Sequence, residues 1–138
     1  FYLKIFSKFD LVMKLNLFLY LSVACFVFSC KKNETSAPVV SIYSPISTDS
    51  FYVSDSVFTH FKIEDNYLKT YKVVFSNYIT HQIYYKEEGN TNATTFNYSQ
   101  NINLPILADT LILLNVLGLD ENGNTGNANV IFKMKYDR

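Results

Sequence analysis

Hydrophobic and polar residues alternate with a period of two along most of the chain from Val39 onward. The apolar positions are rich in β-branched and aromatic side chains, and no stretch shows the spacing of an amphipathic helix. Clusters of Asn, Asp and Ser interrupt the alternation, as is typical of turns. The pattern predicts seven strands, at residues 39–43, 56–64, 68–76, 81–86, 95–104, 110–119 and 129–136.

Two of these segments carry the clearest signals. Apolar and polar side chains take opposite faces of residues 95–104, as expected of an antiparallel strand with one wet face. Residues 110–119 are almost continuously apolar, which predicts a central strand, and Gly118 predicts a bulge or a close backbone approach. The Asn122-Gly123 pair before the last strand predicts a hairpin turn, because both residue types tolerate positive φ.

About seven short strands with regular turn signals predict an all-β fold, an antiparallel immunoglobulin-like β-sandwich. The absence of a Cys…Trp…Cys core pattern excludes an antibody-type domain. The Val-Ser-Ile-x-Ser-Pro start at 40–45, the Ile-x-Leu-Pro segment at 102–105 and the Leu-Asp-Glu-Asn-Gly-Asn segment at 119–124 are similar to Ig-like lipoprotein domains of unknown function in Bacteroidota. The resemblance covers residues 38–137, which we expect to form one domain.

Residues 15–29 form an apolar run about as long as the h-region of a signal peptide. Met13 and Lys14 directly precede this run, so Met13 is the expected start of translation and residues 1–12 are expected upstream sequence. Residues 1–29 are therefore assigned to upstream sequence and a signal peptide. The alternative is an uncleaved N-terminal membrane anchor, although a spanning helix usually needs about 20 apolar residues.

The run ends in Val27-Phe28-Ser29-Cys30, which resembles the lipobox of bacterial lipoproteins. The resemblance implies a diacylglyceryl group on the Cys30 thiol, cleavage between Ser29 and Cys30, and a further acyl chain such as palmitate on the new amine. Two or more acyl chains anchor a protein stably, because each buried CH₂ contributes about 0.8 kcal/mol. Cys25 would leave with the signal peptide, so the mature chain would contain no internal disulfide.

Residues 30–37 are expected to be the lipidated cysteine and a flexible tether, because they are polar and lack apolar periodicity. The segment from Lys31 to Ala37 reaches at most about 25 Å when extended. The Ser-Cys-Lys-Lys start followed by Glu34 looks like lipoproteins of the Bacteroidota. The resemblance implies a cell-envelope protein on the outer membrane, in its surface or periplasmic leaflet.

The formal net charge of the whole sequence is zero, and from Cys30 onward 9 Lys and Arg residues stand against 11 Asp and Glu. No basic stripe is present. This charge pattern argues against a nucleic-acid partner and against a polybasic patch for anionic lipid.

The sequence offers little for metal binding. His60 and His81 are the only histidines, and no recognisable spacing links them to the three or four ligands that zinc needs. Asp120, Asn122 and Asn124 resemble the start of a calcium loop, but the glycine and the closing glutamate of an EF-hand are missing. A hairpin turn explains these residues without a metal, and we predict no metal or other cofactor.

No motif of an activated nucleophile, a phosphate-binding glycine loop or a metalloprotease helix is present. Glu87 and Glu88 fall in a predicted polar loop at residues 87–92 and are interpreted as a solvated pair. We therefore predict that the protein is not an enzyme.

The chain is unusually aromatic, with 11 Tyr and 12 Phe. Tyr84 and Tyr85 are consecutive on one predicted strand and are expected to point to opposite faces. One of them, together with Phe58, is a candidate exposed aromatic that binds a glycan or a protein. Burial in a second apolar layer is the alternative.

These features predict a lipid-anchored, non-enzymatic binding module whose partner is a glycan or an envelope protein. A structural subunit of a larger envelope complex is the alternative. An exposed aromatic row would favour a ligand, and a long apolar edge strand would favour docking by strand addition. The segments Asp55-Ser56-Val57 and Asp109-Thr110-Leu111 also look like sites of O-glycosylation in Bacteroidota.

Overall fold

The computed structural model describes residues 35–136. The predictions for Met13, the signal peptide, cleavage between Ser29 and Cys30, lipidation of Cys30 and most of the tether therefore concern residues outside the described range.

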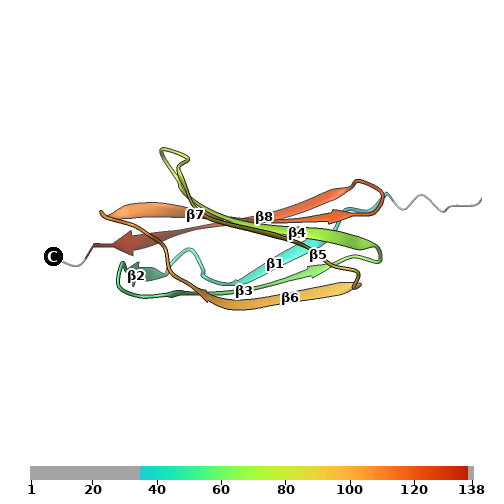
Figure 1. Ribbon diagram of the computed structural model, residues 1–138, viewed down its shortest axis with the longest axis horizontal. Coiled ribbons are helices and arrows are strands. Elements are labelled where there is room, and N and C mark those ends of the chain that lie inside the picture. Colours follow the sequence, from blue (N-terminus) through green and yellow to red (C-terminus); the bar gives the residue numbers. More distant parts are fainter. Residues whose placement is uncertain (1–34, 137–138) are drawn as a thin grey trace, which may run out of the picture. The chain divides into compact units, whose positions relative to one another are not determined.

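The described residues form eight strands and no helix (Figure 1). The strands are β1 Val39–Ser44, β2 Ser50–Tyr52, β3 Val57–Glu64, β4 Leu68–Asn77, β5 Ile83–Asn90, β6 Thr95–Ile102, β7 Thr110–Asp120 and β8 Thr125–Lys135. They make two layers, a three-stranded sheet in the order β1-β3-β6 and a five-stranded sheet in the order β2-β8-β7-β4-β5.

All neighbouring strands are antiparallel except β2, which runs parallel to β8. The chain crosses between the layers after β1, β2, β3, β5 and β6, and strands of the two layers alternate as in immunoglobulin-like sandwiches. The predicted all-β antiparallel sandwich is confirmed. The strand missing from the prediction is β2, because three residues are too few to show an alternating pattern.

The core lies between the two sheets and contains the alternating apolar positions of β3, β4, β6, β7 and β8. Its largest fully buried side chains are Phe61, Phe75, Phe132, Ile63, Ile112, Leu114 and Met134. Phe132 meets Phe75 and Phe51 edge-on, at centroid distances of 6.2 and 5.6 Å. Each such side chain contributes about 1.5–3 kcal/mol when fully buried, so the core accounts for the pairing of the two layers.

The predicted fourth strand and the loop after it are wrong in position. Strand β5 spans Ile83–Asn90, so Glu87 and Glu88 lie within a strand rather than in a polar loop. His81 precedes the strand, with a φ of 60°, in the turn that follows β4. The Oδ1 atom of Asn77 accepts hydrogen bonds from the amides of Ile79 (2.8 Å) and Thr80 (2.9 Å), which folds this turn before β5 begins.

The close backbone approach predicted at Gly118 is confirmed. Gly118 pairs with Gly126 across β7 and β8, and a side chain at either position would meet a neighbour. A Cβ on Gly118 would lie 2.8 Å from Cγ2 of Ile63, and one on Gly126 would collide with the carbonyl of Pro38. Pro38 is buried, so the glycine pair holds the start of β1 against the other sheet.

Candidate functional site

Three aromatic rings lie next to one another on the outer face of the three-stranded sheet. Phe58 and His60 point outward from β3 because their neighbours Val57, Thr59 and Phe61 fill the core. Tyr43 of β1 packs beside His60 with a centroid distance of 5.0 Å, and the centroid of Phe58 lies 6.3 Å from that of His60. We call these three residues the aromatic row; Tyr43 is 52% exposed and Phe58 45%.

A break in the strand pairing positions Tyr43. The register between β1 and β3 shifts between Ile42 and Ser44, so Tyr43 has no paired partner on β3. Ser44 pairs with His60, and its hydroxyl donates a 2.9 Å hydrogen bond to the carbonyl oxygen of Phe58. The end of β1 is thus tied to β3, and this holds the three rings at adjacent places.

Uncharged polar side chains border the aromatic row. Asn101 lies opposite Phe58 on β6 and Ser99 lies opposite His60, and both are exposed. Farther along β3, Lys62 and Glu64 form a 2.6 Å ion pair, and its hydrogen bond raises the pKa of Lys62. The row therefore combines apolar ring faces with neutral donors and acceptors, and the nearest charges satisfy each other.

The rings are inclined rather than coplanar. The plane of His60 makes an angle of 47° with Tyr43 and of 51° with Phe58. A flat, rigid surface stacked on His60 would therefore not stack on either of its neighbours. A single flexible chain can present successive groups to successive rings.

The three aromatic residues proposed from the sequence, Phe58, Tyr84 and Tyr85, differ in their exposure. Phe58 is exposed, but the prediction that Tyr84 and Tyr85 point to opposite faces is wrong. Both are half-buried and pack against the core, because the pairing of β4 with β5 shifts between Phe75 and Ser76 and leaves Tyr84 unpaired. The side-chain amide (Nδ2) of Asn77 donates a 3.2 Å hydrogen bond to the Tyr84 hydroxyl.

Tyr43 and His60 were missed as members of an aromatic group. His60 shares a strand face with Phe58, so its position could have been inferred from the alternation of β3. Tyr43 could not, because its place depends on the register shift in β1.

A second cluster lies at the open side of the sandwich, between the edge strands β5 and β6. Glu87 points inward and accepts hydrogen bonds from the hydroxyls of Tyr71 (2.8 Å), Tyr98 (2.7 Å) and Tyr85 (2.5 Å). The Tyr98 hydroxyl also contacts Oε1 of Gln100 at 3.3 Å. We call Glu87 and its three tyrosines the Glu87 cluster, and it joins the two sheets through side chains.

The hydrogen bonds decide the protonation of the Glu87 cluster. Burial by itself would raise the pKa of Glu87, but the three tyrosine hydroxyls hold it below its usual value. Burial, and then the hydrogen bonds to Tyr85 and Glu87, raise the pKa of Tyr98 far above its usual value. At neutral pH the cluster therefore holds one carboxylate among neutral phenols, and every donor in it faces an acceptor.

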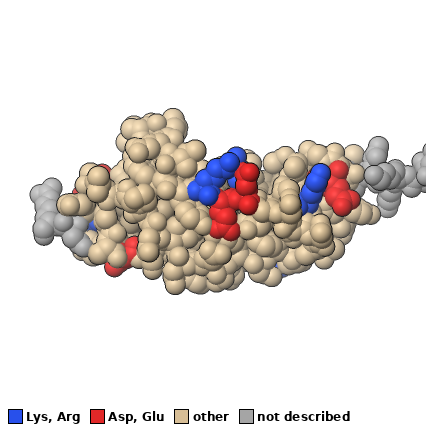
Figure 2. Space-filling model, in the orientation of Figure 1, with Lys and Arg blue, Asp and Glu red and all other residues tan. Residues whose placement is uncertain are grey.

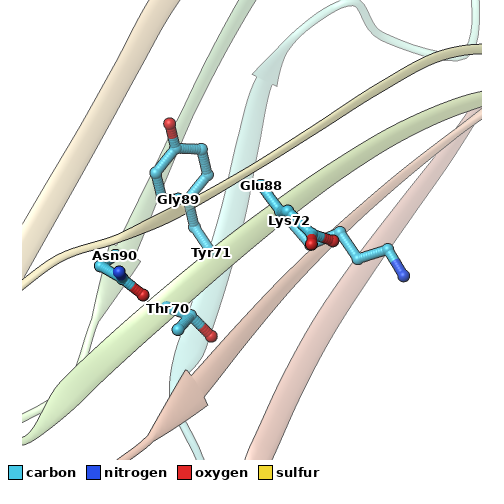
Figure 3. Close-up of a pocket in the computed structure, with 6 residues that line it drawn as sticks. All are labelled: Thr70, Tyr71, Lys72, Glu88, Gly89 and Asn90. Atoms are coloured by element: carbon cyan, nitrogen blue, oxygen red, sulfur yellow. The ribbon is translucent and has the colours of Figure 1, made fainter.

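A hollow of about 380 Å³ adjoins the cluster, lined by Thr70, Tyr71, Lys72, Glu88, Gly89 and Asn90 (Figure 3). Tyr71 extends toward Gly89, while Lys72 and Glu88 lie together on the other face of the strand pair. A Cβ on Gly89 would lie 2.7 Å from Cε1 of Tyr71, so the missing side chain makes room for the ring. The hollow contains no set of converging acid, base and nucleophile.

The residues considered for metal binding are dispersed. His60 belongs to the aromatic row, and His81 is exposed in the turn between β4 and β5. Within residues 35–136, no three His, Cys, Asp or Glu side chains gather closely enough to hold a metal ion.

Asp120 explains the hairpin that resembles a calcium loop. Its buried carboxylate accepts hydrogen bonds from the amides of Asn122 (2.8 Å) and Asn124 (2.7 Å) and from the Asn124 side chain (2.7 Å). Burial tends to raise the pKa of Asp120, but these hydrogen bonds lower it overall. The predicted hairpin turn is confirmed, with Gly123 at a φ of 91°, but Asn122 does not share the positive φ expected of it.

Of the two segments that resemble O-glycosylation sites, only one presents its hydroxyl residue to solvent. Ser56 is exposed before β3. Thr110 is half-buried, and its hydroxyl accepts a 2.8 Å hydrogen bond from the side-chain amide (Nδ2) of Asn77.

Charged side chains form only small groups of both signs on the face shown in Figure 2. Among residues 35–136 there is no helix long and apolar enough to span a membrane.

No protein-family model matches the chain, and no curated protein matches it. Among solved structures, the chain is similar to CopC from Methylosinus trichosporium OB3b, with 11% identity and a TM-score of 0.49. The match covers 73% of this chain and 96% of CopC. At this identity and score, the likeness carries no conclusion about ligand or activity.

Proposed function

We propose that this protein is a lipid-anchored envelope module that binds neutral glycans through the aromatic row, without catalysis. The observation that carries the proposal is the grouping of Tyr43, His60 and Phe58 on one outer face of the sandwich. Rings exposed on a sheet can stack against the apolar face of a sugar ring.

The border of the row supports a neutral ligand. Ser99 and Asn101 project from β6 beside the rings and offer hydroxyl and amide groups suited to sugar hydroxyls. Lys62 and Glu64 are engaged with each other, so neither offers an unpaired charge to an acidic sugar. The inclination of the rings favours a single twisted chain over a flat crystalline surface.

Binding without turnover is supported by the same face. An enzyme that cleaves glycosidic bonds normally places two carboxyl groups beside the scissile bond. Glu64 is the carboxylate that the strand pairing places on this face of β3, and it pairs with Lys62.

The anchor of this proposal is Cys30, on the strength of the lipobox-like Val27-Phe28-Ser29-Cys30 segment. The proposed location is the outer membrane, with residues 30–37 as a short tether. A structural subunit of an envelope complex remains the second candidate function, and the apolar face described below is the observation that favours it.

Affinity electrophoresis of the full chain in detergent tests the ligand. The probes are soluble neutral glucans, mannans and xylans, with acidic polysaccharides for comparison. We expect at least one neutral polysaccharide to retard the protein. Tyr43→Ala and Phe58→Ala should each weaken binding about tenfold, as one aromatic contact contributes about 0.5–1.5 kcal/mol beyond its buried area.

Tyr67→Ala is the matched control, because Tyr67 is 47% exposed but lies in the turn between β3 and β4. Retardation by acidic polysaccharides alone, or binding that survives both row substitutions, would overturn the proposed site. The absence of retardation by any probe would overturn the glycan proposal.

The anchor has a separate test. Protease treatment of intact and lysed cells, with wild type beside Cys30→Ala, reports both location and attachment. We expect Cys30→Ala to leave the membrane fraction or to keep its signal peptide. A substituted protein that is cleaved and still membrane-bound would show that Cys30 is not the anchor.

A further inference from the structure

The outer face of the five-stranded sheet is apolar along its central strand. Strand β7 directs Ile112, Leu114 and Val116 into the core, so its alternate residues point outward. Four of those five outward positions are leucines, and Val74 of β4 and Ile131 of β8 lie beside them. We call this surface the leucine face: Leu111, Leu113, Leu117, Leu119, Val74 and Ile131.

Such a face is unusual for a two-layer sandwich. Antiparallel sheets commonly keep one face in the core and one polar face in water, whereas strands buried on both faces are continuously apolar. The three-stranded sheet follows the first pattern, with Asn97, Ser99 and Asn101 outward on β6. The leucine face follows the second, although Leu111 is 39% exposed and its neighbours on β7 are only half-buried.

The centre of the leucine face contains the second observation. Asn115 is the one polar residue of the outward row, and its amide donates a hydrogen bond to Asn129. Its Oδ1 atom is buried without a hydrogen-bond partner, the sole side-chain atom in this condition within residues 35–136. Buried polar atoms are nearly always satisfied, so hydrogen bonding at Asn115 is incomplete in a single chain. The Oδ1 atom is covered by this chain's own atoms, so a partner reaches it only after the side-chain amide rotates outward.

The arrangement points to a second copy of this chain as the occupant. Two leucines lie on each side of Asn115 at equal intervals along β7, so the outward residues of this strand have the same order in both directions. A half-turn about an axis through Asn115 therefore places leucine on leucine. Such self-matching is what an isologous twofold interface requires, and sheets pack face to face at about 10 Å.

The charges around the face permit this contact. Lys72 lies opposite Leu117, away from the centre, and Glu88 pairs with Lys72 across β4 and β5 and also bonds Lys86 at 3.0 Å. Lys133 lies opposite Leu111 at the far end. Lys86 lies opposite Val74 and is thus level with Asn115, but on the edge strand β5, whereas Val74 and Asn129, which pair directly with Asn115, are uncharged.

We propose that the leucine face is the interface of a homodimer, with Asn115 near its twofold axis. The aromatic row lies on the opposite sheet and stays free in such a dimer. The dimer would present two rows on opposite outer sides, and a ligand with many repeats could engage both. The dimer proposal does not depend on what the row binds.

The first test is the mass of the full chain in detergent, by sedimentation or light scattering. We expect a protein mass of twice that of one chain. The double substitution Leu113→Asp and Leu117→Asp should halve it, while the control Leu107→Asp should not, because Leu107 is 85% exposed in the β6–β7 connection.

Because aspartates on a central strand can also unfold the sheet, cross-linking provides an independent test. In cells, a short bismaleimide should link the full-length Asn115→Cys variant into a species of twice the chain mass. Leu107→Cys and the unsubstituted chain serve as controls. A monomeric wild type, or an Asn115→Cys variant that links only to another protein or to nothing, would overturn the proposal.

Discussion

The carbonyl group of Pro38 occupies the space into which a side chain at Gly126 would project. Gly126 pairs with Gly118, whose own missing side chain makes room for Ile63 and for the Pro38 ring. The start of β1 in one sheet therefore lies directly on the backbone of the other. This contact closes the end of the sandwich at which the described chain enters the fold.

Gly126→Ala should destabilise the domain by about 1–3 kcal/mol, because an added methyl group in a filled space forces the backbone to shift. Amide exchange should rise along β1, because the contact of Pro38 with Gly126 at the start of this strand is lost. Gly123→Ala is the control, since nothing lies within 4 Å of that position and its cost arises only from the φ of 91°. Exchange in β1 that is unchanged in Gly126→Ala would contradict the role given to this contact.

Gly89→Ala tests the packing of the Glu87 cluster. The new Cβ would lie 2.7–2.9 Å from three atoms of the Tyr71 side chain, so we expect a loss of about 1–3 kcal/mol in chemical denaturation. In a Tyr71→Ala background the same substitution should cost much less, because the clashing ring is absent. Equal costs in both backgrounds would show that Gly89 acts through backbone conformation instead.

Glu87→Gln should lower stability by about 2 kcal/mol at neutral pH, because hydrogen bonds to a charged acceptor become neutral ones. The pKa of Glu87 is below its usual 4.5 in the folded protein. Its contribution is therefore present above pH 4.5 and is lost as pH falls through the lowered value. The free energies of unfolding of wild type and Glu87→Gln should become equal in acid. A difference between them that does not change with pH would contradict this assignment.

Tyr98 should resist ionisation in alkali. Its pKa in the folded protein lies above the usual value of 10.0. The stability that it contributes is thus complete below pH 10 and is lost as pH rises toward the folded value. The pKa values of Tyr71 and Tyr85 are raised too, so tyrosinate absorbance should develop late for three residues in wild type, and Tyr98→Phe should remove the latest component. An early, uniform titration would show that the phenol is not held neutral.

Alternation along the chain predicted the sandwich and most of its core. Val57, Phe61 and Ile63 alternate with outward residues over a whole strand, so the sequence alone identifies their shared face. The central place of β7 likewise follows from its continuous apolar run. These features are local, and they needed no knowledge of which strands become neighbours.

The candidate sites depend on pairing between distant strands, which alternation does not reveal. Glu87 looked like part of a polar loop because its neighbours are charged or small. Its inward position follows from the register of β5 on β4, and its tyrosine partners come from three different strands. Tyr43 joins the aromatic row through a register shift that no local signal marks.

The direction of β1 also decides how the domain bears a mechanical load. From Pro38 the strand runs antiparallel to β3 over five paired positions. A pull on the preceding chain acts along this strand, so the backbone hydrogen bonds to β3 share the tension instead of breaking one after another. If the domain is held from that end while its other side binds a polymer, the paired strands β1 and β3 are loaded in shear. Their resistance to the force then grows with the number of paired residues.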